Sequence, residues 1–215
     1  MKNSLFFCYT LSSLFLLWGC NNRSSDSEKK AKEANRAKID SQMMGSPSAE
    51  SLAVIPSKAD ADFLVEAASG GMTEVQLGQL AQTNSMNKQV KAFGALMIKD
   101  HGAGNEKLKA LAASKNIILP DSVSNHQQKM KERLEKKKGE AFDRAYISMM
   151  VDDHKKDIKE FERELKSGSD ADIRAFADSS LHMLRTHLDS AESCSKRIKG
   201  TGKKLSSDNK PPTGY

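Results

Sequence analysis

The sequence lacks the cysteine pairs that hold many small exported domains together. Of its three cysteines, Cys8 and Cys20 lie within the first twenty residues, and only Cys194 lies beyond them. We expect Cys8 to be removed with a leader peptide and Cys20 to be modified, so no intramolecular disulfide can form. The folded part must therefore be held by helix packing or by a bound ion.

Several other features are absent, and each absence excludes a class of structure or function. The sequence has no Gly-rich phosphate loop, no nucleophile elbow and no Cys-x-x-Cys motif. No stretch alternates polar and apolar residues with period two, so a sheet is not expected. Acidic and basic residues are interleaved at a formal net charge of +6. Because no basic cluster carries interleaved aromatic residues, nucleic acid is not an expected partner.

The N-terminus resembles a bacterial lipoprotein signal peptide. An apolar run over residues 5–17 is too short to span a bilayer stably, and it ends at Gly19 and Cys20 before turning polar at Asn21. We expect residues 1–19 to be removed and Cys20 to be lipidated, which would attach the chain to a membrane of the cell envelope. Asn21 gives no signal for retention at the inner membrane, so we expect the outer membrane. An ordinary secretory signal or a weak membrane anchor is the alternative.

Composition divides the mature chain into three parts. Residues 20–58 are rich in Ser, Lys, Ala and Asn and predict a disordered tether, with at most a transient helix over 28–40. Residues 200–215 contain three glycines and two prolines and predict a disordered tail. The folded domain is therefore expected over 59–199, a length that suits one domain.

Apolar residues repeat at spacings of three and four throughout this domain, which predicts four long helices. The expected ranges are 60–83, 87–114, 140–166 and 171–198. A short amphipathic segment over 124–138 lies in the long connection between the second and third helices. The other two connections are short, so each pair should form an antiparallel hairpin. The sequence thus predicts an all-α, antiparallel four-helix bundle with a short extra helix in its middle connection.

One polar residue interrupts the apolar stripe near the middle of each long helix. These residues are Glu74, His101, His154 and His187. His101 and His154 end two similar ten-residue stretches that share the pattern Ala-aromatic-x-x-(Leu/Met)-Met-(Ile/Val)-x-Asp-His. The midpoints of antiparallel helices of similar length lie at one level, so the four polar groups should meet in the core. Three imidazoles and one carboxylate suit one divalent transition metal, whose identity the sequence does not give.

Other interpretations of these residues stay open. A metal-free polar network that fixes helix register is the alternative to a metal site. Asp100 and Asp153 precede their histidines and could orient an imidazole of a neighbouring helix, or they could be exposed charges. Met97 and Met150 fit adaptable core filling, with a thioether site for Cu(I) as the sharper alternative.

Several motifs occur in an order that matches a known family. They are Phe63 to Gly71, Met72-Thr73-Glu74-Val75, Val90-Lys91-Ala92-Phe93, Met97 to His101, Phe142 to Tyr146, Asp153-His154 and Leu184 to Leu188. Over about 60–199 the chain resembles the bacterial "domain of unknown function 4142" proteins, which are predicted outer-membrane proteins of the ferritin-like superfamily. The resemblance implies a ferritin-like four-helix bundle and no established activity.

The residues argue against the di-iron chemistry of many ferritin-like proteins. Those sites use Glu-x-x-His on two of their helices. Here the residues three positions before the histidines are Ile98, Val151 and Leu184, none of which can bind iron. A mononuclear site, or no metal, fits the sequence better.

Three functional hypotheses follow. The first is a lipid-anchored binding module whose core holds one transition metal, structurally or for sequestration. The second is a metal-free envelope protein that acts through its surface in stress tolerance or partner binding. The third, a peroxide-consuming redox metalloenzyme, is the least favoured because a closed four-ligand site leaves no position for substrate. The sequence identifies no protein partner, and a homodimer stays open.

Overall fold

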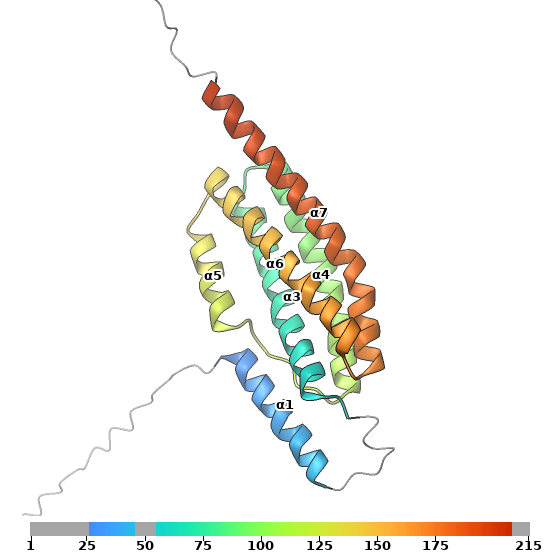
Figure 1. Ribbon diagram of the computed structural model, residues 1–215. Helices are drawn as coiled ribbons and strands as arrows, with labels where there is room; N and C mark the ends of the chain where they lie inside the picture. Colours follow the sequence, from blue (N-terminus) through green and yellow to red (C-terminus); the bar gives the residue numbers. More distant parts are fainter. Residues whose placement is uncertain (1–25, 46–54, 208–215) are drawn as a thin grey trace, which may run out of the picture.

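The structure, a computed structural model, describes residues 26–45 and 55–207, and its secondary structure in those ranges consists of α-helices and connecting segments, without a strand. The helices are α1 (Ser27–Met44), α3 (Lys58–Asn84), α4 (Lys88–Ser114), α5 (Asn125–Glu135), α6 (Gly139–Ser167) and α7 (Ala171–Ser207) (Figure 1). The predicted all-α class is confirmed. Within the described ranges, no helix combines the length and the apolar character needed to cross a membrane.

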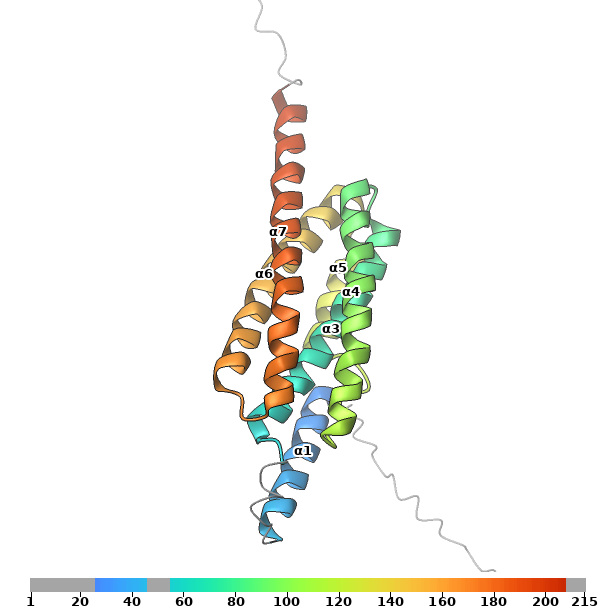
Figure 2. The same ribbon diagram turned by 90° about the vertical axis from the view of Figure 1, so that its right-hand side faces the viewer.

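The four long helices pack side by side in a ring. α3 packs along α4 and α6 along α7, while α3 also contacts α6 and α4 also contacts α7 (Figures 1 and 2). The short helices α1 and α5 lie outside this ring, and both contact α3. α7 is the longest helix and extends beyond the ends of its neighbours (Figure 2).

Side-chain caps fix where three of the four long helices, α3, α4 and α7, begin, and hence the level of their core residues. At the start of α3, the Ser57 hydroxyl accepts from the Asp60 backbone N–H and the Asp60 carboxylate accepts from the Ser57 N–H, both at 3.1 Å. At the start of α7, Asp170 accepts from two backbone N–H groups of the first turn. The predicted ranges of α3, α4 and α6 agree with the observed ends within two residues.

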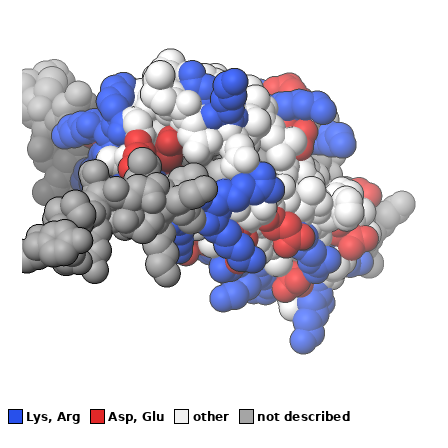
Figure 3. All heavy atoms as spheres, turned by 90° about the horizontal axis from the view of Figure 1, so that it is seen from above, with Lys and Arg blue, Asp and Glu red and all other residues white. Residues whose placement is uncertain are grey.

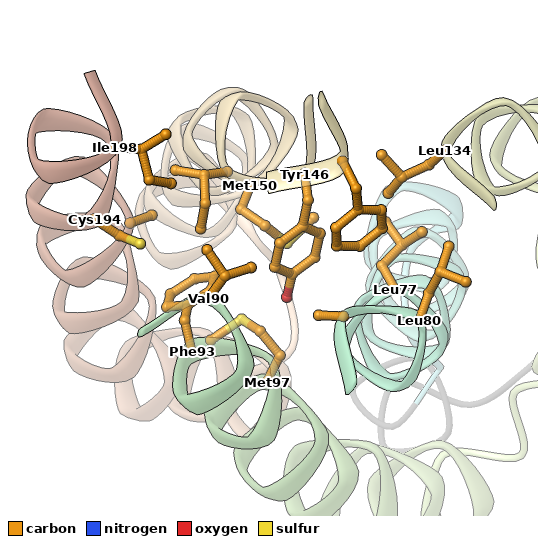
Figure 4. Close-up of a cluster of buried hydrophobic side chains, with 14 residues drawn as sticks. Leu77, Leu80, Val90, Phe93, Met97, Leu134, Tyr146, Met150, Cys194 and Ile198 are labelled. Carbon is orange, nitrogen blue, oxygen red and sulfur yellow. The ribbon is translucent and has the colours of Figure 1, made fainter. Parts of the chain in front are cut away.

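The core consists of two apolar clusters, one towards each end of the four long helices. The first contains Leu77, Val90, Phe93, Met97, Phe142, Tyr146, Ile147, Met150, Ala191, Cys194 and Ile198 among others (Figure 4). The second contains Ala61, Phe63, Leu64, Leu108, Ala112, Ile173 and Ala177 among others. On α3, α4 and α7, the polar residue predicted for the site falls in sequence between members of the two clusters; on α6, it falls between the first cluster and Phe161, which packs against the second. The apolar core is therefore interrupted by one polar layer.

Two glycines bring α3 and α4 into close contact. A Cβ atom added at Gly78 would lie 2.6 Å from the backbone oxygen of Gly94, and one added at Gly94 would lie 2.7 Å from the Cβ of Ala81. These separations are too short for real side-chain contacts, so the two backbones approach each other only because both residues lack a side chain.

Helix α1 corrects the prediction of a disordered tether over residues 20–58. The structure has a helix over Ser27–Met44, longer than the transient one that was allowed for, and it packs on α3. The Asn35 side-chain amide both donates to the Ile118 carbonyl and accepts from the Ile118 N–H, each at 2.8 Å. Its buried stripe is Ala31, Asn35 and Ile39. α1 thus docks through two apolar residues, Ala31 and Ile39, and through long-range hydrogen bonds, which its polar composition does not reveal.

The remaining predicted boundaries are tested only in part. The signal peptide over 1–19, the lipidation site Cys20, residues 46–54 and the end of the tail over 208–215 lie outside the described residues. The helix predicted to end at 198 continues to Ser207, into the segment predicted as tail. On the face seen in Figure 3, basic and acidic side chains are interspersed, as the sequence led us to expect.

The contact between α3 and α4 gives a stability prediction. We expect Gly94→Ala to lower the free energy of unfolding by about 1–3 kcal/mol, because its new methyl group must displace Ala81 or the α3 backbone. The matched control is Gly102→Ala on the same helix, where a Cβ meets nothing within 4 Å. That variant should be neutral or more stable by up to about 1 kcal/mol. Urea unfolding of both variants measures this, and equal stabilities would contradict the close contact.

Candidate metal centre

The four predicted residues meet in the polar layer between the two apolar clusters. Glu74 of α3, His101 of α4, His154 of α6 and His187 of α7 are each at most 5% exposed. Their contacts follow the ring of helices: Glu74 reaches His101 and His154, and His187 reaches the same two histidines. Each contact between neighbouring helices in the ring therefore includes one contact between site residues. The predicted convergence at a common level is found in the structure.

A backbone carbonyl fixes the proton of His154. Its Nδ1 lies 2.9 Å from the carbonyl oxygen of Met150, one turn earlier on α6. A carbonyl oxygen can only accept, so Nδ1 must carry the proton. The neutral imidazole then presents a bare lone pair at Nε2.

Carboxylates fix the protons of the other two imidazoles in the same way. His101 Nδ1 lies 2.7 Å from Glu74 Oε2, and His187 Nε2 lies 3.0 Å from Asp100 Oδ2. Each carboxylate accepts the imidazole proton, which leaves the lone pair on His101 Nε2 and on His187 Nδ1. Such outer partners orient metal-binding histidines in many proteins and keep the ligand nitrogen deprotonated.

The three bare nitrogens face one another. His187 Nδ1 lies 3.2 Å from His101 Nε2 and 3.4 Å from His154 Nε2. Ligand atoms of all three histidines lie within 4.8 Å of one another. With every proton on the outer side, none of these contacts can be a hydrogen bond. A tetrahedral ion with metal–nitrogen bonds of about 2.0–2.1 Å separates its ligand atoms by roughly 3.3 Å, so the two separations from His187 Nδ1 fit a bound cation.

Glu74 offers a fourth donor atom to the same space. Its Oε1 is buried and has no hydrogen-bond partner, and it lies 3.5 Å from His154 Nε2. Because both atoms are acceptors when the carboxyl is ionised, this contact also needs a cation or a proton between them. A buried carboxylate oxygen without a partner is costly, by about 1–3 kcal/mol or more.

Burial controls the protonation of the centre. It raises the pKa of Glu74 to about 7, with the charge of His154 opposing the rise. It lowers the pKa of His101 to about 4, and it is also the largest cause of the lowered pKa values of His154 and His187. The interior thus favours neutral imidazoles, which is the form in which histidine binds a metal.

The two predicted supporting aspartates occupy different places. Asp100 accepts from His187 of the neighbouring helix, as the interpretation of an orienting residue required. Asp153 is half-buried, and within the described ranges no hydrogen bond joins it to any of the three imidazoles. It lines a cavity beside Glu74 instead. Met97 and Met150 lie in the first apolar cluster, which agrees with core filling (Figure 4).

Sequence reasoning missed the carbonyl of Met150 as the partner of His154. A backbone acceptor one turn away carries no residue signature, and only the rotamer of His154 reveals it. The position of the histidine on the stripe could be inferred, but the direction of its second nitrogen could not.

Comparisons with known proteins identify the fold and leave the activity open. A family profile described as "Domain of unknown function (DUF4142)" matches residues 45–194, which is more than two thirds of the chain and begins after α1. The crystal structure of a DUF305 fragment from Deinococcus radiodurans is similar, with a TM-score of 0.59 and 11% identity. That match covers 66% of this chain and 99% of the fragment, and at this identity it indicates the fold alone. No curated protein matches the chain.

The raised pKa of Glu74 gives a prediction for chelator-treated protein. Folded Glu74 holds its proton up to a pKa of about 7, against an ordinary value of 4.5. Wild-type stability should therefore fall as the pH rises from about 4.5 to 7. In the Glu74→Gln variant, the amide can accept from His101 and donate to His154, and it does not titrate. Above pH 7 we therefore expect the free energy of unfolding of this variant to exceed that of wild type by about 1–3 kcal/mol. Urea unfolding across this range measures the difference, and identical pH slopes would contradict it.

Proposed function

We propose that this chain, which belongs to the DUF4142 family, binds one divalent transition-metal ion in the middle of its helical core. The ligands are His101, His154 and His187, with Glu74 as the fourth. The family name carries no activity, so the proposal rests on the geometry of the centre. The bound ion either holds the helices in register or is sequestered by the protein.

One observation carries this proposal: three neutral imidazoles turn their lone pairs towards a common point. Their other nitrogens are held by Glu74, Asp100 and the Met150 carbonyl. A cation at the common point satisfies all three lone pairs and the free oxygen of Glu74 together. Nitrogen and carboxylate ligands suit Zn²⁺, Co²⁺ and related ions.

The finer description of the fold is part of the proposal. Four long helices that contact one another in a ring support an antiparallel four-helix bundle of ferritin-like type. Ile98, Val151 and Leu184 still stand where di-iron members carry carboxylates, so we propose a mononuclear centre. Export and lipid anchoring at Cys20, with an outer-membrane location, are proposed from the leader sequence alone.

A metal-free polar network is the second candidate, and the pKa of Glu74 favours it. A proton on Glu74 Oε1 could be donated to His154 Nε2, which would satisfy both atoms. That proton leaves His187 Nδ1 and His101 Nε2 facing each other at 3.2 Å with two bare lone pairs. A metal ion accounts for both contacts, so we favour the metal.

Metal titration of the full-length protein, purified in mild detergent, tests the proposal. After chelator treatment, we expect Co²⁺ to bind at one ion per chain and to give the intense visible absorption of a tetrahedral site. His187→Ala should abolish this absorption, because it removes the nitrogen shared by two of the contacts. His182→Ala is the matched control on the same helix, since His182 is exposed and outside the centre.

The same titration distinguishes the two candidates. Wild-type protein that takes up no Co²⁺ or Zn²⁺, and melts at the same temperature with and without chelator, would overturn metal binding and favour the polar network. Loss of absorption in both histidine variants would also contradict the assigned ligands.

A further inference from the structure

A cavity of about 890 Å³ adjoins the candidate metal centre. Its walls include parts of α3, α4, α6 and α7, and residues of α1 and α5 line it as well. Glu74 and His101 belong to this lining, whereas His154 and His187 do not. The cavity therefore meets the centre on the side of Glu74 and His101.

The cavity is acidic although the whole chain is basic. Seven acidic side chains line it against four basic ones, while the chain as a whole has a formal net charge of +6. Two of the basic residues are already paired: Lys32 with Glu28 and Glu66 at 2.8 and 2.6 Å, and Arg163 with Glu160 at 2.5 Å.

The unpaired acidic residues of the cavity wall lie beside the metal centre. Asp153 and Asp157 are one turn apart on α6, and neither forms an ion pair or hydrogen bond within the described ranges. Burial raises the pKa of Asp157, and the nearby charges of Glu74 and Asp153 raise it further, which shows how closely these three carboxyl groups lie. The basic residue that acts on both aspartates is Lys156, which is exposed. This end of the cavity therefore gathers three carboxyl groups, Glu74, Asp153 and Asp157, and Lys156 acts on the two aspartates without forming an ion pair with either within the described ranges.

Two glycines leave the cavity open. A Cβ atom added at Gly70 of α3 or at Gly104 of α4 would meet nothing within 4 Å, and both residues line the cavity. Side chains at these positions would project into free space rather than into a neighbouring helix. Gly102, two residues from Gly104, also has free space at its Cβ but does not line the cavity.

We propose that this cavity is the passage through which a hydrated divalent cation reaches the three histidines, and that Asp153 and Asp157 attract the cation to its inner end. The inference rests on the proposed metal centre. Carboxylates suit a hydrated cation, and an acidic cleft with low-dielectric walls raises the local cation concentration and the association rate by roughly 10- to 1,000-fold. The imidazole lone pairs then replace the water ligands, without a proton leaving any histidine.

Stopped-flow loading of Co²⁺ into chelator-treated, full-length protein tests the passage itself. We expect Gly104→Leu to slow the appearance of the visible absorption several-fold, because the new side chain fills the passage. The final absorption and the stoichiometry should match wild type, since Gly104 does not contact the ligands. Gly102→Leu is the matched control and should load at the wild-type rate. Equal rates in the two variants would overturn the passage.

Charge variants test the role of the acidic wall. Asp157→Asn should lower the second-order loading rate several-fold at low salt and weaken its salt dependence. Asp152→Asn removes the same charge from an exposed neighbouring position on α6 and should leave the rate unchanged. A wild-type rate in Asp157→Asn, or a changed absorption spectrum that marks Asp157 as a ligand, would overturn this role. Absence of any Co²⁺ uptake by wild type would overturn the metal centre as well.

Discussion

The polar layer across the core is the constraint on which the rest of the structure depends. On each long helix a polar side chain lies between two apolar clusters, and none of the four is more than 5% exposed. Apolar residues of similar size would usually make such a core equally or more stable. The layer is tolerated because each imidazole has an acceptor for its one proton. That arrangement in turn leaves three lone pairs and the free Glu74 oxygen without a partner, which a cation would provide.

Much of this layer could be predicted from the sequence because its causes are local. Helical periodicity places Glu74, His101, His154 and His187 on the apolar stripes, and short connections bring the helix midpoints to one level. Capping residues such as Asp170 could be identified for the same reason, since they act on the N–H groups two and three residues later. The order of contacts round the ring then follows from which helices are neighbours.

The parts that sequence reasoning missed depend on long-range contacts or on side-chain direction. α1 has too few large apolar residues to indicate a buried helix, and its docking depends on hydrogen bonds between Asn35 and Ile118, 83 residues away. Asp100 and Asp153 stand in the same position of a repeated motif, yet only Asp100 reaches an imidazole. Their different roles follow from which helix each one faces. The cavity had no signature because it arises where glycines supply no side chain.

The cavity also changes how the centre should be interpreted. Four ligands read from the sequence describe a closed site, in which an ion would be purely structural. The structure instead places Glu74 and His101 at the wall of a cavity whose acidic lining reverses the net positive charge of the chain. A basic exterior repels a cation, so a buried cation site in this protein needs a local region of opposite charge to be reached. Asp153 and Asp157 belong to that lining. Neither of these half-buried carboxyl groups forms a hydrogen bond within the described ranges, so a passing cation would give both of them a partner.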